Sequence, residues 1–321
     1  MAQAVAYIIE FLLTYTSIEA GTAVIIATVF VYGAATYLIN RGLNALTPRR
    51  KNGETRGQDV TIVDTTAPIV IPYGQVRLGG VHNIPPLVYS ADGKGRYLHQ
   101  ILLLGYTPNG CGGLDSVYID QTEITAANIT AITGSANDGK VTAGDFADIL
   151  WARFRDGTQS TVDYILNSYS STAFSSNFVG ADLANLMLQF DFGDGKKWQG
   201  TTRAMSAVFR ASKVYDPRLD SSPGADPTNS SYIAYRRNPA LTTANFLMSP
   251  VGGAFPADEI DWDDVVTAAD ICDELVADKD GGTQPRYTCN GVIYCVPEQF
   301  EDNVKKLVDS MLGFITYRDG K

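Results

Sequence analysis

The sequence predicts an α+β fold in three parts: N-terminal apolar helices, a β-rich domain that forms a small barrel or sandwich, and a second domain of α+β class. Three observations support this prediction. Residues 4–39 are largely apolar, the middle of the chain holds short β-branched runs separated by Gly and Pro, and two apolar patterns of helical period follow. The expected segments are apolar helices at 1–47, a polar linker at 48–59, domain I at 60–215 with an inserted unit at about 126–192, and domain II at 216–321.

The length and charge of the chain limit its classes of function. A chain of 321 residues can bury the cores of two or three domains. The formal net charge of −10 argues against a nucleic-acid-binding surface, which needs clustered Lys and Arg. We therefore expect no sequence-specific binding of nucleic acid.

The apolar run at residues 20–39 contains no charged side chain and is long enough for a transmembrane helix. Basic residues follow it and would place that side in the cytoplasm. These residues are Arg41, Arg49, Arg50 and Lys51. The run also fits a helix buried against other protein chains, with Gly21 and Gly33 permitting close approach. The residues expected to face neighbours or lipid are Val24, Ile25, Phe30 and Val31.

Domain I is expected to consist of strands joined by short turns, such as the turn at 120–123. The expected strands lie at 67–81, 97–106, 114–119 and 198–213. Within the inserted unit we expect a short helix at 145–154 and a loop at 168–177.

Domain II contains clear helix signals. Asn238 is a good N-cap and Pro239 suits the first helical position, which predicts a short helix to about Met248. Asp261 is placed to cap a second helix, just before Trp262. Its expected apolar stripe consists of Val265, Ala268, Ala269, Cys272, Leu275 and Val276.

The last part of the chain predicts further strands and a third helix. Residues 287–296 are expected to form a strand or a hairpin around Asn290-Gly291. Pro297 begins a helix, and residues 314–317 begin a strand into a turn at Asp319-Gly320. The apolar face of that helix consists of Phe300, Val304, Leu307, Val308, Met311 and Leu312. We expect the polypeptide to continue, or this last strand to pair with another chain.

Patterns that could carry chemistry are incomplete. Gly139 and Asp145 keep the spacing of positions 6 and 12 of a calcium loop, but Gly134 and Ala136, at its first and third positions, have no side-chain oxygens, so a plain turn is favoured. Asp191 to Asp194 reads as a hairpin turn, and two His residues without a placed nucleophile give no hydrolase triad. The four Cys residues lack CxxC spacing, which predicts free, buried thiols. We expect no catalytic, cofactor or metal site. Arg218 and Arg286 are expected to form structural ion pairs, for which Asp216 and Asp261 are plausible partners.

The order of segments from residue 215 to residue 321 resembles the hub region of the tail tip attachment protein J (host specificity protein) family of lambda-like siphophages. The resemblance is weaker over 67–119 and absent before that. The residues that carry it include Asp216, Pro217, Arg218, Asn238, Pro239, Trp262, Pro285, Arg286 and Cys289.

This resemblance implies a structural virion protein, not an enzyme: the central hub of a tail tip, assembled in the host cytoplasm, which closes the tail tube and carries host-recognition parts. It implies a homotrimer that contacts a distal tail or tube-end ring protein, the tape measure protein and other tail tip proteins. The host receptor would be bound through parts beyond this chain, and the apolar helix could enter a host membrane during infection. The alternative is a membrane-anchored bacterial surface or secretion protein that spans the bilayer at 20–39. A third reading is an enzyme domain from a prophage lysis cassette.

Overall fold

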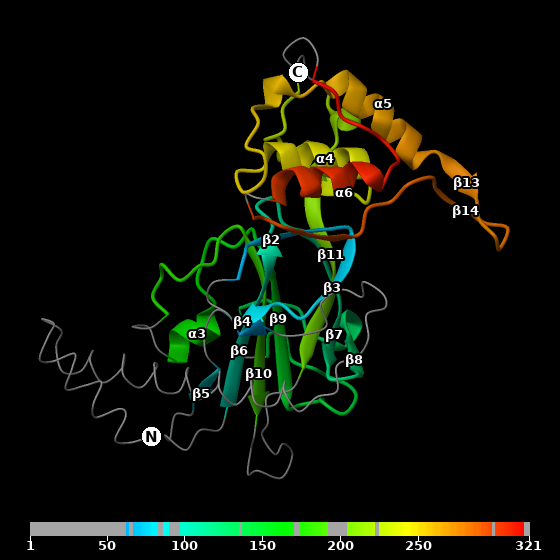
Figure 1. Ribbon diagram of the computed structural model, residues 1–321. Coiled ribbons are helices and arrows are strands. Elements are labelled where there is room, and N and C mark those ends of the chain that lie inside the picture. Colours follow the sequence, from blue (N-terminus) through cyan, green and yellow to red (C-terminus); the bar gives the residue numbers. More distant parts are fainter. Residues whose placement is uncertain are drawn as a thin grey trace, which may run out of the picture. The chain divides into compact units, whose positions relative to one another are not determined.

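The computed structural model describes residues 62–63, 67–82, 86–89, 97–134, 137–169, 174–191, 204–221, 225–296 and 299–317 (Figure 1). The apolar run at 20–39, the linker, Asp194 and the turn at 319–320 lie outside the described residues. Among the described residues, no helix has the length and apolar character needed to span a bilayer.

A six-stranded sheet forms one layer of the β-rich part. Its path is β1-β4-β6-β10-β9, with β5 also paired to β6, and all pairs are antiparallel except β1 with β4. Its strands are β1 (Ile62–Val63), β4 (Val81–His82), β5 (Leu87–Tyr89), β6 (Tyr97–Tyr106), β9 (Leu150–Asp156) and β10 (Leu183–Asp191).

A five-stranded sheet forms the second layer, along the path β12-β11-β7-β8 with β3 also paired to β11. Its strands are β3 (Gln75–Leu78), β7 (Cys111–Ile119), β8 (Thr122–Thr125), β11 (Met205–Tyr215) and β12 (Ile233–Tyr235). Short 3-10 helices are η1 (Ala126–Asn128), η2 (Pro217–Leu219), η3 (Ser230–Tyr232) and η4 (Ala257–Glu259).

One apolar core joins the two sheets. Leu102 of β6 and Leu186 of β10 belong to the same buried cluster as Val117 of β7 and Phe209 of β11. Side chains alternate between the two faces of each strand, so the residues between them point away from this core. The described strands form two open paths that pack face to face, which fits the predicted sandwich and not a closed barrel.

The segment 126–192, predicted as an inserted unit, contributes the strands β9 and β10 to the six-stranded sheet, and β10 pairs along the whole of β6. The helix predicted at 145–154 is wrong. Residues 145–149 form a turn and β9 begins at Leu150, since pairing with β10 holds this apolar run extended. A short helix, α3 (Tyr164–Tyr169), includes the first two residues of the expected loop at 168–177.

Three helices lie together at one end of β11 (Figure 1). They are α4 (Pro239–Met248), α5 (Trp262–Asp273) and α6 (Phe300–Asp309). α4 packs against both α5 and α6, and a second apolar core lies among them. Leu307 of α6 is buried as predicted, whereas Leu312 is exposed because the helix has already ended.

The helical layer includes a strand that lies far earlier in the chain. β15 (Gly291–Tyr294) pairs antiparallel with β2 (Val70–Tyr73). The strand predicted at 287–296 is therefore present in part, but the hairpin at Asn290-Gly291 is wrong. Because β2 contributes Ile71 and Tyr73 to the second core, the expected boundary near residue 215 does not divide the β-rich and helical parts cleanly.

The apolar stripe predicted to reach Val276 ends earlier. α5 stops at Asp273, and β13 (Leu275–Ala277) pairs with β14 (Thr283–Pro285) as a hairpin that extends from the helix (Figure 1). The backbone N–H of Arg286 donates to the carbonyl of Glu274 at 2.8 Å, which holds the chain extended there. Leu275 is consequently 66% exposed, so its predicted burial is wrong.

Candidate interaction surface

Most of the residues that carry the family resemblance build a junction between the end of β11 and the helices. At its centre, the buried Asp216 carboxylate accepts from Arg218 Nε at 2.8 Å and Nη2 at 2.9 Å, and from Arg236 Nε at 3.1 Å. The Arg218 guanidinium also contacts Asp270 Oδ1 at 3.2 Å and Asp273 Oδ2 at 2.9 Å on α5. Asp216 is thus the expected partner of Arg218.

The charges at this junction stabilise each other. Burial alone would raise the pKa of Asp216, but the hydrogen bonds and charges of Arg218 and Arg236 outweigh it and hold the pKa below its usual value. The hydrogen bond to Asp216 is the largest cause that raises the pKa of Arg218. Both groups are therefore charged at neutral pH, and they act as a fixed ion pair.

Asn238 ties α4 to α5. Its Oδ1 accepts from the backbone N–H of Ala240 at 3.0 Å and of Leu241 at 3.4 Å, which is the N-cap that the sequence predicts. Its Nδ2 donates to the carbonyl of Ala269 on α5 at 2.9 Å. Pro239 occupies the first position of the helix. One buried side chain therefore both begins a helix and joins it to its neighbour.

Trp262 joins α5 to the end of β11. Its ring meets the ring of Tyr215 edge to face, with centroids 5.1 Å apart, and its Nε1 donates to the carbonyl of Ala257 at 2.9 Å. Asp261 caps α5 by accepting from the backbone N–H of Asp264 at 3.2 Å, as the sequence predicts. The first turn of this helix is therefore anchored on both sides.

The other residues that carry the family resemblance lie at or after the hairpin of β13 and β14. Arg286 pairs with Glu274 at 2.6 Å and not with Asp261, while Pro285 pairs in register with Leu275. Cys289 is buried, burial raises the pKa of its thiol, and its N–H donates to the carbonyl of Arg237 at 2.7 Å. All four Cys residues are free thiols. These contacts serve architecture, and within the described ranges no group of three or more His, Cys, Asp or Glu side chains is arranged to hold a metal ion.

A buried ion pair on the outer face of the six-stranded sheet was not predicted from the sequence. Arg153 of β9, only 1% exposed, donates through Nε to Asp163 Oδ2 at 3.1 Å. Asp163 also caps α3 by accepting from the N–H groups of Ile165 and Leu166, each at 3.1 Å. Nearby, burial and then the charge of Arg153 lower the pKa of His99 to about 4. The cluster fastens α3 to the sheet.

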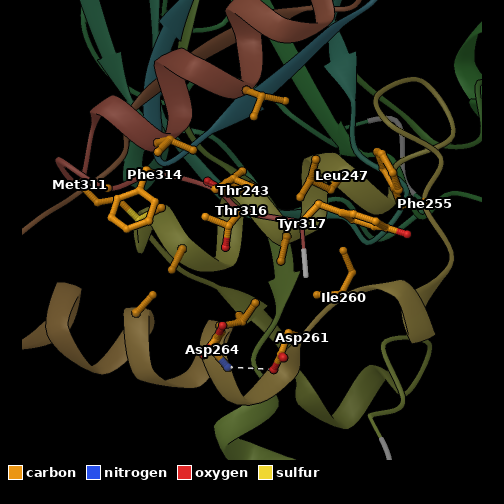
Figure 2. A pocket seen from close by; sticks show the side chains of 18 of the residues that line it. Thr243, Leu247, Phe255, Ile260, Asp261, Asp264, Met311, Phe314, Thr316 and Tyr317 are labelled. Carbon is orange, nitrogen blue, oxygen red and sulfur yellow. Dashed lines mark hydrogen bonds between the residues drawn. The ribbon is translucent and has the colours of Figure 1, made fainter. Parts of the chain in front are cut away.

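A groove of about 660 Å³ lies among the three helices (Figure 2). α4 contributes Ala240, Ala244 and Leu247, and α5 and α6 contribute Val265 and Val304. The segment 313–317, which we name the strap, runs along the groove without a strand partner among the described residues. The strand predicted at 314–317 is thus absent.

The strap leaves large apolar side chains in solvent. Phe314 is 84% exposed and Tyr317 is 79% exposed. In Figure 2, Phe314 lies beside Met311 and Tyr317 points toward Phe255. Sequence reasoning missed the groove because its walls come from segments that are separate in the chain. The alternating apolar residues after α6 were the one available signal.

Comparisons with known proteins give little further information. No protein-family model and no curated protein matches the chain. Among solved structures, the chain is similar to one chain of the virion of a native gene transfer agent (GTA) particle, with a TM-score of 0.39 and 12% sequence identity. The similarity covers 80% of this chain and 64% of that chain, so this chain spans less than two thirds of the other's length. A likeness at this level carries no weight for function.

Proposed function

We propose that this chain is a structural virion protein, the central hub of a siphophage tail tip, which closes the tail tube and carries host-recognition parts. One observation carries the proposal: most of the residues that carry the family resemblance make structural contacts at one junction between β11 and the helices. Asp216 and Arg218 hold α5, Asn238 joins α4 to α5, and Trp262 packs on Tyr215. A structural component of an assembly needs residues that hold its own elements in place, and these residues do so.

The hub is proposed to act without catalysis and as a homotrimer at the tail tip of the virion. Its proposed partners are a distal tail or tube-end ring protein, the tape measure protein and other tail tip proteins, with the host receptor reached through other parts of the tip. The exposed apolar groups around the groove support a role in assembly, because large exposed apolar patches mark interaction sites. A tube cap must also match the symmetry of its tube by closing a ring.

The oligomeric state of the intact chain tests this proposal first. Mass photometry or native mass spectrometry of the full chain is expected to give a trimer, with interfaces above roughly 2,000 Å², the range of permanent assemblies. Antibodies against residues 216–321 should then label one end of the tail in electron micrographs of virions. A monomer, together with label that stays in the bacterial membrane fraction, would instead support the membrane-anchored alternative that the charge-free run at 20–39 suggests.

A further inference from the structure

We propose that the groove among α4, α5 and α6 binds an amphipathic helix of a partner protein whose apolar face is flanked by Lys and Arg residues. The proposal rests on the assembly role argued above, because it gives that role a specific protein partner and a specific surface. Three features of the described residues support it: an apolar floor, an acidic rim and an exposed aromatic strap.

The floor of the groove suits the apolar face of a helix. α4 packs against both α5 and α6, and its small and aliphatic side chains form the floor between them. An added helix would lie along α4 with α5 and α6 on either side, in the helix-in-groove mode of recognition. Its residues at positions i, i+3, i+4 and i+7 would cover Ala244, Leu247, Val265 and Val304.

The rim of the groove is acidic. Of the charged side chains that line it, five are carboxylates and one is Lys305, which already pairs with Asp309 at 2.5 Å. The other four carboxylates are Glu259, Asp261, Asp264 and Glu301. Clefts with apolar walls strengthen the field of such charges, so a cationic partner is attracted and an anionic one is repelled. Fatty acids and anionic lipid headgroups are therefore poor occupants.

The strap adds aromatic rings along the groove. Phe314 and Tyr317 are almost fully exposed, and Phe255 is also an exposed apolar side chain of the lining. Lys and Arg side chains lay their aliphatic stems on such rings and place their charge over the ring face. An apolar floor, carboxylates and exposed aromatic rings together match a helix with Lys and Arg beside its apolar face.

A pair of model peptides tests the proposal on the full chain. The first is a fluorescent, end-capped helix of about 18 residues, with Leu on one face and Lys on the flanks, and the second has Glu in place of Lys. Fluorescence anisotropy is expected to show binding of the Lys peptide, and binding of the Glu peptide at least about tenfold weaker. Raising the salt concentration from about 50 mM to about 500 mM should weaken the binding of the Lys peptide.

The chain offers matched variants. Glu259→Gln, Asp264→Asn and Glu301→Gln together remove three charges from the rim. The control replaces their neighbours, Asp258, Asp263 and Asp302, by Asn, because these are exposed acids at adjacent positions that do not line the groove. The rim variant should weaken binding of the Lys peptide by about tenfold, and the control should leave it within about twofold. Equal unfolding midpoints in urea would show that both variants fold alike.

A second variant tests the strap. Phe314→Ser with Tyr317→Ser should weaken binding of the Lys peptide without lowering stability, because both rings are exposed. No binding of the Lys peptide, equal binding of both peptides, or equal loss in the rim and control variants would overturn the proposal. These outcomes are separate from the hub proposal, since the oligomeric state and the position of the chain in the virion are measured without the peptide.

Discussion

Arg218 and Asp216 are two residues apart in the chain, yet their ion pair reaches a helix that begins more than forty positions later. The Asp216 carboxylate is only 2% exposed and accepts two hydrogen bonds from the guanidinium, which in turn contacts Asp270 and Asp273 of α5. A local pair thereby fixes where α5 lies against the end of β11.

Removal of the central carboxylate should destabilise this junction strongly. Asp216→Asn leaves Arg218 and Arg236 without their buried counter-charge, so we expect a loss of about 3 kcal/mol in the free energy of unfolding in urea. Asp270→Asn is the control, since its 66% exposed side chain should contribute less than about 1 kcal/mol. Equal losses would contradict the central role of Asp216. Because the folded pKa of Asp216 is lowered, its contribution is present above about pH 4 and is lost as the pH falls below that value.

Asn238 should show two separable contributions. Asn238→Ala removes the cap of α4 and the donor to the Ala269 carbonyl, with an expected loss of about 2–3 kcal/mol. Asn238→Ser keeps a neutral capping oxygen and removes the amide donor to Ala269, so its loss should be smaller, about 1 kcal/mol. Urea unfolding at neutral pH measures both. If the two variants were equally unstable, the cap would contribute nothing.

The hairpin that follows α5 should tolerate a charge at a position that the sequence assigns to the core. Leu275→Asp is expected to change the free energy of unfolding by no more than about 0.5 kcal/mol, because Leu275 is exposed. Leu307→Ala in α6, where the side chain is 2% exposed, should cost about 2–5 kcal/mol. Thermal unfolding compares them directly. A large loss from Leu275→Asp would mean that the helical stripe continues past Asp273.

The free energy of unfolding should decrease in mild acid because of His99. Its pKa is lowered to about 4 in the folded state, so between about pH 6.5 and pH 4 the unfolded chain binds the proton more readily. Stability is therefore complete above about pH 6.5 and falls below it, by up to about 3 kcal/mol from this group. Burial also lowers the pKa of His82, which adds to the same trend.

The control for this pH effect is His99→Gln, which cannot titrate. The urea concentration at the unfolding midpoint should decrease for the parent chain as the pH is lowered from about 7 to about 5. The decrease should be smaller for the variant. A variant with the same slope as the parent would assign the effect to other groups.

Features set by neighbouring residues were predictable from the sequence. The caps at Asn238 and Asp261 depend on a side chain and the next few backbone N–H groups, so the pattern alone is sufficient. The strand of residues 97–106 was likewise predictable, because its short aliphatic run, Ile101 to Leu104, lies between aromatic residues and is recognised without knowledge of distant partners.

Features set by distant partners were not predictable. The apolar run at 145–154 has helical spacing, but β10 holds its second half as a strand. Asn290-Gly291 suggests a two-residue hairpin, yet Asn290 Oδ1 accepts from the N–H of Gln75 at 3.0 Å and β15 pairs with β2. The groove combines three helices and the strap, so no single window of sequence contains it.

The pairing of β2 with β15 has a consequence for how the chain reaches its folded state. β2 is made early during synthesis and its partner strand more than two hundred residues later, so the helical layer cannot close until nearly the whole described chain has left the ribosome. Gly74, at φ +67° and against the Cys289 carbonyl, fixes the turn that delivers β2 to this place. A fragment that starts at residue 216 would lack Ile71 and Tyr73 and would expose β15 as an open edge, prone to aggregation. Soluble expression of this protein should therefore require both ends of the described chain in one polypeptide, or β2 supplied as a separate peptide.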